Sequence, residues 1–220
     1  KLGRYIIKTY QDQESLEKAY SNKEVTAISG LPAAPDSYQA DETTTEYSLP
    51  LAGQVMAFFK TSQAPLNDKD VRQALVLAAD RQKLIAATSY PLLPSDSPLL
   101  KSQLGYNKQY TQPTGNLKKA QQLLDKAEWK QNGNDPIRKQ KGAPLKLRLY
   151  AEANSEYAAV AGELQREWRA LGVDTQVTLQ PASDLQVTAA RHNYDVFLTA
   201  ISTGADPDVF AYWHSSQSDI

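Results

Sequence analysis

The last third of the chain has the clearest pattern of apolar and polar positions. Residues 145–151 alternate leucines with charged residues, which predicts a strand with one buried and one solvated face. Residues 156–171 repeat apolar side chains at i, i+3 and i+4 and are followed by Gly172, which predicts a helix that ends there. Apolar, β-branched runs predict two further strands, at 173–180 and 194–201.

This order of elements predicts a fold class. A short helix, expected to be capped by Ser183, separates the last two strands, so the order is strand–helix–strand–helix–strand. Such units form right-handed crossovers onto a largely parallel sheet, and we expect Leu164 and Trp168 to be buried against it. In open α/β sheets ligands bind beyond the carboxyl ends of the strands. The residues that follow 194–201 therefore lie where a site is expected.

The middle of the chain predicts helices separated by a long loop. Asn67 or Asp68 caps a helix through 68–88, with Leu75 in its apolar stripe. Residues 90–115 hold four prolines and two glycines without periodicity, and loops of this length are often functional or pack over a neighbouring surface. An amphipathic helix capped by Asn116 covers 116–129, and turn residues follow it.

The first sixty residues carry a weaker pattern. β-branched and aromatic residues predict strands at 4–10 and 25–31, on either side of a short helix in 12–24. A loop rich in proline, alanine and threonine covers 32–46. A strand-like run over 46–61 follows. Because Pro50 cannot donate a backbone hydrogen bond, the first half of this run is expected at the edge of a sheet.

Composition excludes several classes of function. The chain has 24 basic and 25 acidic residues among 220, so it offers no excess of positive charge for nucleic acid or for a membrane surface. It contains no cysteine, which excludes disulfides, thiolate catalysis and cysteine-ligated metals. No apolar run reaches the roughly 20 residues of a membrane span. The first residues begin inside a strand-like pattern without an initiator methionine, so we interpret the chain as a fragment of a longer protein.

Motifs for catalysis and cofactors are absent from the sequence. It contains neither a glycine-rich phosphate loop nor a Gly-x-Ser-x-Gly nucleophile elbow. Its two histidines, His192 and His214, lack the spacing of a zinc site, and His192 is interpreted as a structural turn residue. We therefore expect no enzyme activity, no cofactor and no metal.

The stretch 203–213 combines small residues, an acid–proline–acid turn and aromatics. Asp206 and Pro207 can start a helix as its cap and first turn, and the aromatics after them can be plain core. The same stretch also suits a ligand rim, because small residues leave the backbone approachable and Asp208, Tyr212 and Trp213 supply a carboxylate and flat surfaces. The two interpretations are compatible. The predicted ligand-binding residues are Thr203, Gly204, Ala205, Asp206, Asp208, Tyr212 and Trp213.

Four segments in order resemble the family 5 extracellular solute-binding proteins, the peptide/nickel-type receptors of ABC importers. They are SQAPLNDKDVRQALVLAADRQKLI (62–85), NLKKAQQLLDKAEW (116–129), the strand–helix–strand 146–180, and YDVFLTAISTGADPDVFAYWHSS (194–216). The resemblance implies a type II periplasmic-binding-protein-like α/β lobe, with a mixed, largely parallel sheet flanked by helices. It places residues 1–60 in the trailing part of a first lobe and the hinge connector, and 61–220 in most of the second, ligand-clamping lobe.

The resemblance also implies a function. The expected protein is the substrate-binding component of an ABC importer, a monomer that captures a small solute, a peptide, between two lobes and delivers it to a membrane permease. It would work outside the cytoplasm, in the periplasm or at the cell surface, lipid-anchored through an N-terminus that precedes these residues. Peptide receptors of this family hold the ligand's amino group with an aspartate, for which this chain has only Ser202 to Ala205.

Two alternatives follow from that difference and from the fold class. One is a cell-surface interaction module derived from such a receptor and without a transport role. The other is an α/β hydrolase, which ranks lower because no nucleophile and base stand in a motif.

Overall fold

A computed structural model describes residues 3–31, 34–47, 53–89, 92–202 and 210. The chain divides into two compact units, residues 1–48 and 49–220, which are described separately. No helix in the described residues is long and apolar enough to cross a membrane.

The first unit is small and helical. It contains α1 (Gln13–Ser21), capped by Asp12, and one turn of helix, α2 (Asp36–Gln39). The rings of Tyr20 and Tyr38 meet edge to face at 5.0 Å, and the Tyr38 hydroxyl donates a hydrogen bond to the Glu17 carbonyl at 3.1 Å. These contacts join α1 to α2.

The strands predicted at 4–10 and 25–31 are wrong for the described residues, which have no strand there. The side chains of Tyr5, Ile6 and Ile7 are exposed. β-branched and aromatic residues fit a pleated surface, but a strand also needs a partner to accept its hydrogen bonds. No such partner stands beside 4–10 within the described part of this unit.

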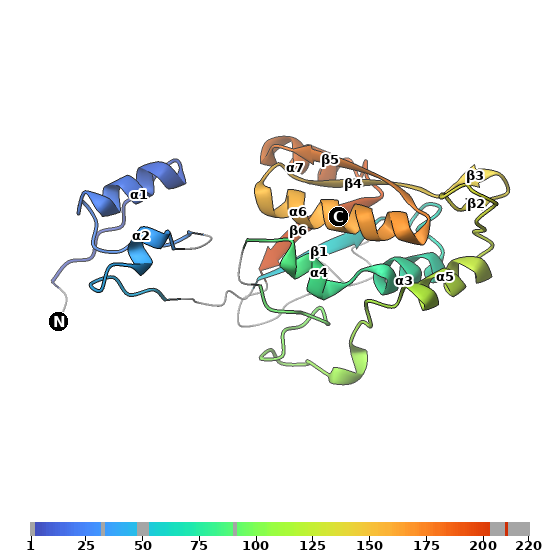
Figure 1. The fold of residues 1–220 in the computed structure, drawn as a ribbon, viewed down its shortest axis with the longest axis horizontal. Helices are drawn as coiled ribbons and strands as arrows, with labels where there is room; N and C mark the ends of the chain where they lie inside the picture. Colours follow the sequence, from blue (N-terminus) through green and yellow to red (C-terminus); the bar gives the residue numbers. More distant parts are fainter. Residues whose placement is uncertain (1–2, 32–33, 48–52, 90–91, 203–209, 211–220) are drawn as a thin grey trace. The chain divides into compact units, whose positions relative to one another are not determined.

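The second unit contains the remaining elements (Figure 1). It begins with β1 (Gly53–Phe59), α3 (Lys69–Ala78) and α4 (Arg81–Ala86), and a long loop then leads through the 3-10 helix η1 (Lys108–Tyr110) to α5 (Leu117–Lys126). A small hairpin, β2 (Lys139–Gln140) and β3 (Ala143–Pro144), follows. The chain then forms β4 (Lys146–Glu152), α6 (Ser155–Leu171), β5 (Asp174–Gln180), α7 (Ala182–Ala190) and β6 (Val196–Ser202).

The four-stranded sheet is mixed, in the order β1-β6-β4-β5. β4 runs parallel to β5 and to β6, and β1 pairs antiparallel with β6, with Gly53 opposite Ser202. The crossovers β4–α6–β5 and β5–α7–β6 move across the sheet in opposite directions. Right-handed connections therefore place α6 and α7 on opposite faces. The predicted strands 145–151, 173–180 and 194–201 and the helix 156–171 are confirmed.

The core lies between the sheet and the helices α3, α5 and α6. Leu75 of α3 is fully buried, which confirms its predicted place. Leu164 and Trp168 of α6 are also buried, at 4% and 1% exposure, as predicted. The Trp168 indole N–H donates a hydrogen bond to the Leu75 carbonyl at 3.0 Å, so the buried polar atom of this ring is satisfied.

The predicted helix over 68–88 is two helices. α3 is capped by Asp68 and ends at Ala78, and Asp80 caps α4 through a 3.0 Å bond from the Gln82 amide. The freed carbonyls of α3 find partners from another segment, because Asn116 N–H donates to Leu77 O at 2.7 Å. Asp80, which stands within the apolar stripe of the predicted helix, is therefore the N-cap of a second helix.

One cap was also predicted wrongly. α7 begins at Ala182 after Pro181, and no side chain caps it. Ser183 lies within the first turn. Proline fits this position because its ring fixes the backbone and its missing N–H needs no partner.

Asp195 joins three segments at the amino ends of β4 and β6. Its carboxylate accepts hydrogen bonds from the Arg148 amide at 2.8 Å and from the Gln63 side chain at 3.0 Å. The Arg148 guanidinium pairs with the same group. Lys60 donates to the His192 carbonyl at 2.7 Å nearby. These contacts hold the segment after β1 against the sheet and leave the opposite, carboxyl edge for a site.

Candidate functional site

The predicted rim residues Thr203, Gly204, Ala205, Asp206, Asp208, Tyr212 and Trp213 all lie outside the described residues, as does His214. The structure describes the strand that leads to them and the elements beside it. Phe210 is described and is 51% exposed. His192 stands in the turn between α7 and β6 with a positive φ of 49°, the turn position expected from the sequence.

The carboxyl ends of three parallel strands meet at one edge of the sheet. β4 ends at Glu152, β5 at Gln180 and β6 at Ser202, and β1 starts at the same edge because it runs antiparallel to β6. This is the edge at which open α/β sheets bind ligands. The segment 203–213 follows directly from it.

The first turn of α6 adds acidic and aromatic groups to this edge. Asn154 caps the helix by accepting the Tyr157 amide at 2.9 Å. Burial raises the pKa of the Glu156 carboxyl. Burial also raises the pKa of the Tyr157 phenol, and hydrogen bonds with the Ala200 backbone and the Thr199 side chain oppose this rise. Tyr157 is therefore positioned against β6 just before its end.

These side chains were missed by the sequence reasoning. Glu152 is the last residue of β4 and Glu156 lies in the first turn of α6, and both carboxylates contribute to raising the pKa of the Tyr157 phenol. No basic side chain pairs with either of them in the described part of the chain. A signal was present, because Glu152 ends β4 and Glu156 and Tyr157 follow it, just as 203–213 follow β6 in the sequence. The end of β4 and the first turn of α6 thus contribute two carboxyl groups to this edge.

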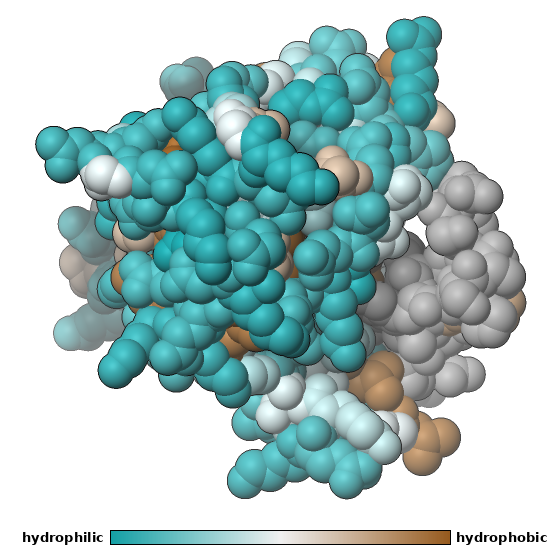
Figure 2. Space-filling model, turned by 90° about the vertical axis from the view of Figure 1, so that its right-hand side faces the viewer, coloured by the Kyte–Doolittle hydropathy of each residue, from teal (hydrophilic) through white to brown (hydrophobic). Residues whose placement is uncertain are grey.

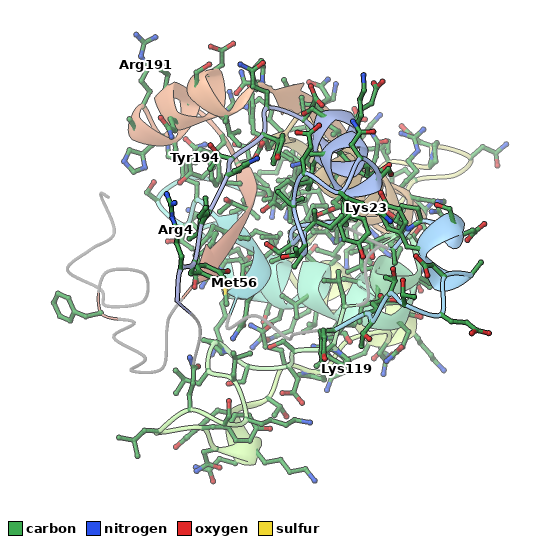
Figure 3. All side chains as sticks on the ribbon, turned by 90° about the vertical axis from the view of Figure 1, so that its left-hand side faces the viewer. Arg4, Lys23, Met56, Lys119, Arg191 and Tyr194 are labelled. Carbon is green, nitrogen blue, oxygen red and sulfur yellow. The ribbon has the colours of Figure 1, made fainter. Side chains whose placement is uncertain are left out.

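The face of the sheet that carries α7 has larger apolar side chains on β6 and β1. Met56, labelled in Figure 3, lies on β1 opposite Thr199 of β6, and Phe58 lies opposite Phe197. The Phe197 ring lies 5.2 Å from that of Tyr194, between centroids. Burial raises the pKa of the Tyr194 phenol. This group offers flat apolar surface next to the strands that reach the carboxyl edge.

Two cavities among the described residues have linings that include none of the edge residues Glu152, Gln180 and Ser202. One, of about 300 Å³, is in the first unit between Ala34 and Glu46. The other, of about 110 Å³, lies where α3, α4 and α6 meet. Its lining includes Lys83 and the buried Glu167, whose Oε2 accepts the Asp80 amide at 2.8 Å. Among the described residues no cluster of histidines and acidic residues is suited to a metal ion.

Glu167 makes stability depend on pH. Burial raises the pKa of its carboxyl above the ordinary 4.5, and the Asp80 amide and Lys83 oppose the rise. The folded state therefore binds the Glu167 proton more tightly than the unfolded state does. The protonated carboxyl stabilises the fold most below about pH 4.5, and this stabilisation is lost as the pH rises through the pKa of the folded state. Glu167→Gln keeps an acceptor for the Asp80 amide but does not titrate. Its free energy of unfolding should therefore depend less on pH than that of the wild type. Urea unfolding of both proteins at pH 4 and pH 7 measures it, and an equal pH dependence contradicts it.

Comparisons with known proteins agree with this geometry. The family described as bacterial extracellular solute-binding proteins, family 5 Middle, matches residues 1–220. The chain is 29% identical over 160 residues to the oligopeptide-binding protein AppA of Bacillus subtilis, covering 68% of this chain and 29% of that protein. It is 27% identical over 143 residues to the nickel-binding periplasmic protein of Escherichia coli, covering 64% and 27%.

A solved structure shows the same fold. The ABC transporter substrate-binding protein CtaP of Listeria monocytogenes matches 96% of this chain and 43% of its own, with a TM-score of 0.78 and 21% identity. The predicted fold class, a periplasmic-binding-protein-like α/β lobe with a mixed sheet flanked by helices, is thus confirmed. The chain spans less than a third of the curated relatives it matches.

Proposed function

Because the chain belongs to the bacterial extracellular solute-binding proteins of family 5, we propose that it is part of the substrate-binding component of an ABC importer. The protein captures a small peptide in a cleft between two lobes and delivers it to a membrane permease. Residues 1–60 contribute to one lobe and the hinge connector, whose last strand, β1, pairs with β6 in the sheet of the other lobe, and 61–220 form most of that lobe. Binding by burial, backbone hydrogen bonds and closure requires no catalytic group, so the protein is not an enzyme.

One observation carries this proposal. β6 runs parallel to β4 and ends at Ser202 on the carboxyl edge of the sheet, so the segment that follows starts where ligands of such sheets bind. The rim residues proposed to bind the solute are Thr203, Gly204, Ala205, Asp206, Asp208, Tyr212 and Trp213. Glu152 and Glu156, at the same edge, supply carboxylates for a cationic group of the ligand.

A peptide is favoured over a metal complex as the ligand. AppA is named as an oligopeptide-binding protein, and the second curated relative as a nickel-binding protein. The carboxyl edge of this chain offers acidic and aromatic groups, which suit the cationic and apolar parts of a peptide. The family is described as extracellular and the second curated relative is named as periplasmic, and we propose an extracytoplasmic location here, with a lipid anchor on an N-terminal segment that precedes these residues.

The test uses the full-length protein that contains this chain. The purified protein is incubated with a library of random hexapeptides and, separately, with Ni(II)–histidine, and bound material is identified by mass spectrometry after gel filtration. We expect a reproducible set of peptides to be retained. Retention of Ni(II)–histidine instead would replace the peptide with a metal complex, and retention of neither would favour an interaction module without a transported solute.

A further inference from the structure

The loop between α4 and α5 is fixed at the carboxyl edge of the sheet. Gln54 of β1 is 7% exposed, and both ends of its amide are used. Its Nε2 donates to the Pro98 carbonyl at 3.2 Å, and its Oε1 accepts the Ser95 hydroxyl at 3.3 Å. Gln54 pairs with Ile201 across the sheet. The loop is therefore tied to the edge two residues before Thr203.

Other contacts hold the remainder of this loop. The Gln112 amide donates to the Asp96 carbonyl at 2.7 Å, and Arg81 of α4 donates to the Gln112 carbonyl at 3.1 Å. Gln103, 8% exposed, accepts the Leu100 amide through its side chain at 2.8 Å. A loop with this many internal bonds presents its outer side chains in a defined arrangement, although most of it has no regular secondary structure.

The outer side chains of the loop are apolar to an unusual degree. Leu93 is 78% exposed, Leu104 87% and Tyr110 70%. Charged residues between 92 and 115 are only Asp96, Lys101 and Lys108. Figure 2 shows hydrophobic atoms at the lower edge of a face that is otherwise mainly hydrophilic, at the level where this loop lies in Figure 1. Single exposed leucines are ordinary, but three large apolar side chains on one fixed loop mark a binding surface.

We infer that the loop 92–110 is a wall of the proposed cleft that binds the apolar side chains of the solute, and that Gln54 is the residue that positions it. This rests on the proposed function and names the substrate class: peptides rich in large apolar residues. The loop is hydrogen-bonded to β1, which pairs with β6, and β6 leads in sequence into 203–213, so the solute bound at this edge is the expected occupant of the loop surface. The acidic edge then takes the cationic part of the peptide and the loop takes its apolar part.

The experiment repeats the hexapeptide selection with three variants of the full-length protein. Leu104→Ser combined with Tyr110→Ser removes apolar surface from the loop, and Gln54→Met removes its tether while keeping a similar volume. Val187→Ser on α7, where Val187 is 48% exposed, is the matched control for losing an exposed apolar side chain elsewhere. Calorimetry then gives the Kd of the most enriched apolar peptide for each protein.

We expect wild type and the α7 control to retain the same apolar peptides. The loop double variant should bind them roughly tenfold or more weakly, as expected for losing burial of one large side chain, and should shift the retained set towards polar peptides. Gln54→Met leaves the side chains of the loop unchanged but should also shift the retained peptides towards polar ones. A general loss of stability would lower retention of all peptides and would not produce this shift. An unchanged set and Kd in the double variant overturns the inference alone, and no retained peptide in wild type overturns both it and the peptide assignment.

Discussion

Replacing Gly172 with alanine should lower the free energy of unfolding by about 3–5 kcal/mol. Gly172 ends α6 with φ of 98°, a left-handed conformation that costs a residue with a Cβ about 1–2 kcal/mol. An added Cβ would also lie 2.7 Å from Cγ of Arg138 and 3.3 Å from the Pro136 carbonyl oxygen. Arg138 must therefore move.

Arg138 has little freedom to move. It is 4% exposed, and its guanidinium donates to the Leu171 carbonyl at 2.9 Å and to the Trp129 carbonyl at 2.7 Å. The same group pairs with Asp125. Shifting it leaves buried acceptors without donors, and this loss is larger than the backbone strain alone. The side chain thus ties α5, α6 and the segment before β2 together.

Gly142 provides the matched control for this experiment. It has φ of 85° in the β2–β3 turn, and an added Cβ there meets nothing within 4 Å. Gly142→Ala should cost only the backbone term, about 1–2 kcal/mol. Urea unfolding followed by tryptophan fluorescence measures both variants. The excess cost at Gly172 should shrink in an Arg138→Ala background, because the clashing atoms are gone, and equal costs at the two glycines would contradict the packing argument.

The parts of the fold predicted correctly are those in which one pattern decides the structure. The alternation in 145–151 and the helical repeat in 156–171 ended by Gly172 both come from burial on one face of an element, and both were found. Asn116 capped its helix as predicted, because a short polar side chain before an apolar repeat has few other roles.

The errors share a physical cause, namely dependence on a partner elsewhere in the chain. Residues 4–10 have the composition of a strand but no partner strand in the described residues, so propensity alone failed. The break at Asp80 depends on the carboxylate of Glu167, which is distant in sequence and accepts the Asp80 amide. The role of Gln54 was equally invisible, because its partners Ser95 and Pro98 are about forty residues away.

The location of the candidate site could be predicted from the sequence, whereas several of the side chains beside it could not. The order of strands and helices located the edge where β6 ends, because parallel strands share their carboxyl ends. The contributions of Glu152, Glu156 and Tyr157 required the structure, since they come from a neighbouring strand–helix junction. The residues 203–213 stay a prediction that only ligand binding can test.

Replacing Thr203 with tryptophan should weaken binding of a retained peptide by about a hundredfold or more, which corresponds to about 3 kcal/mol of binding free energy. Thr203 is the first residue after β6, so a bulky ring there should occupy the proposed ligand path at the carboxyl edge. The substitution lies outside the strands of the sheet, since β6 ends at Ser202, so we expect the fold to tolerate it. Thr203→Ser is the matched control and should bind as wild type does.

Calorimetric titration of a retained hexapeptide into full-length wild type, Thr203→Ser and Thr203→Trp proteins is the most direct test of the account. Thermal unfolding of each protein checks that the fold is intact. The account predicts equal Kd values for the first two proteins and a Kd raised about a hundredfold or more, or no detectable heat, for Thr203→Trp. A folded Thr203→Trp protein that binds the peptide with the wild-type Kd would contradict the placement of the ligand at this edge.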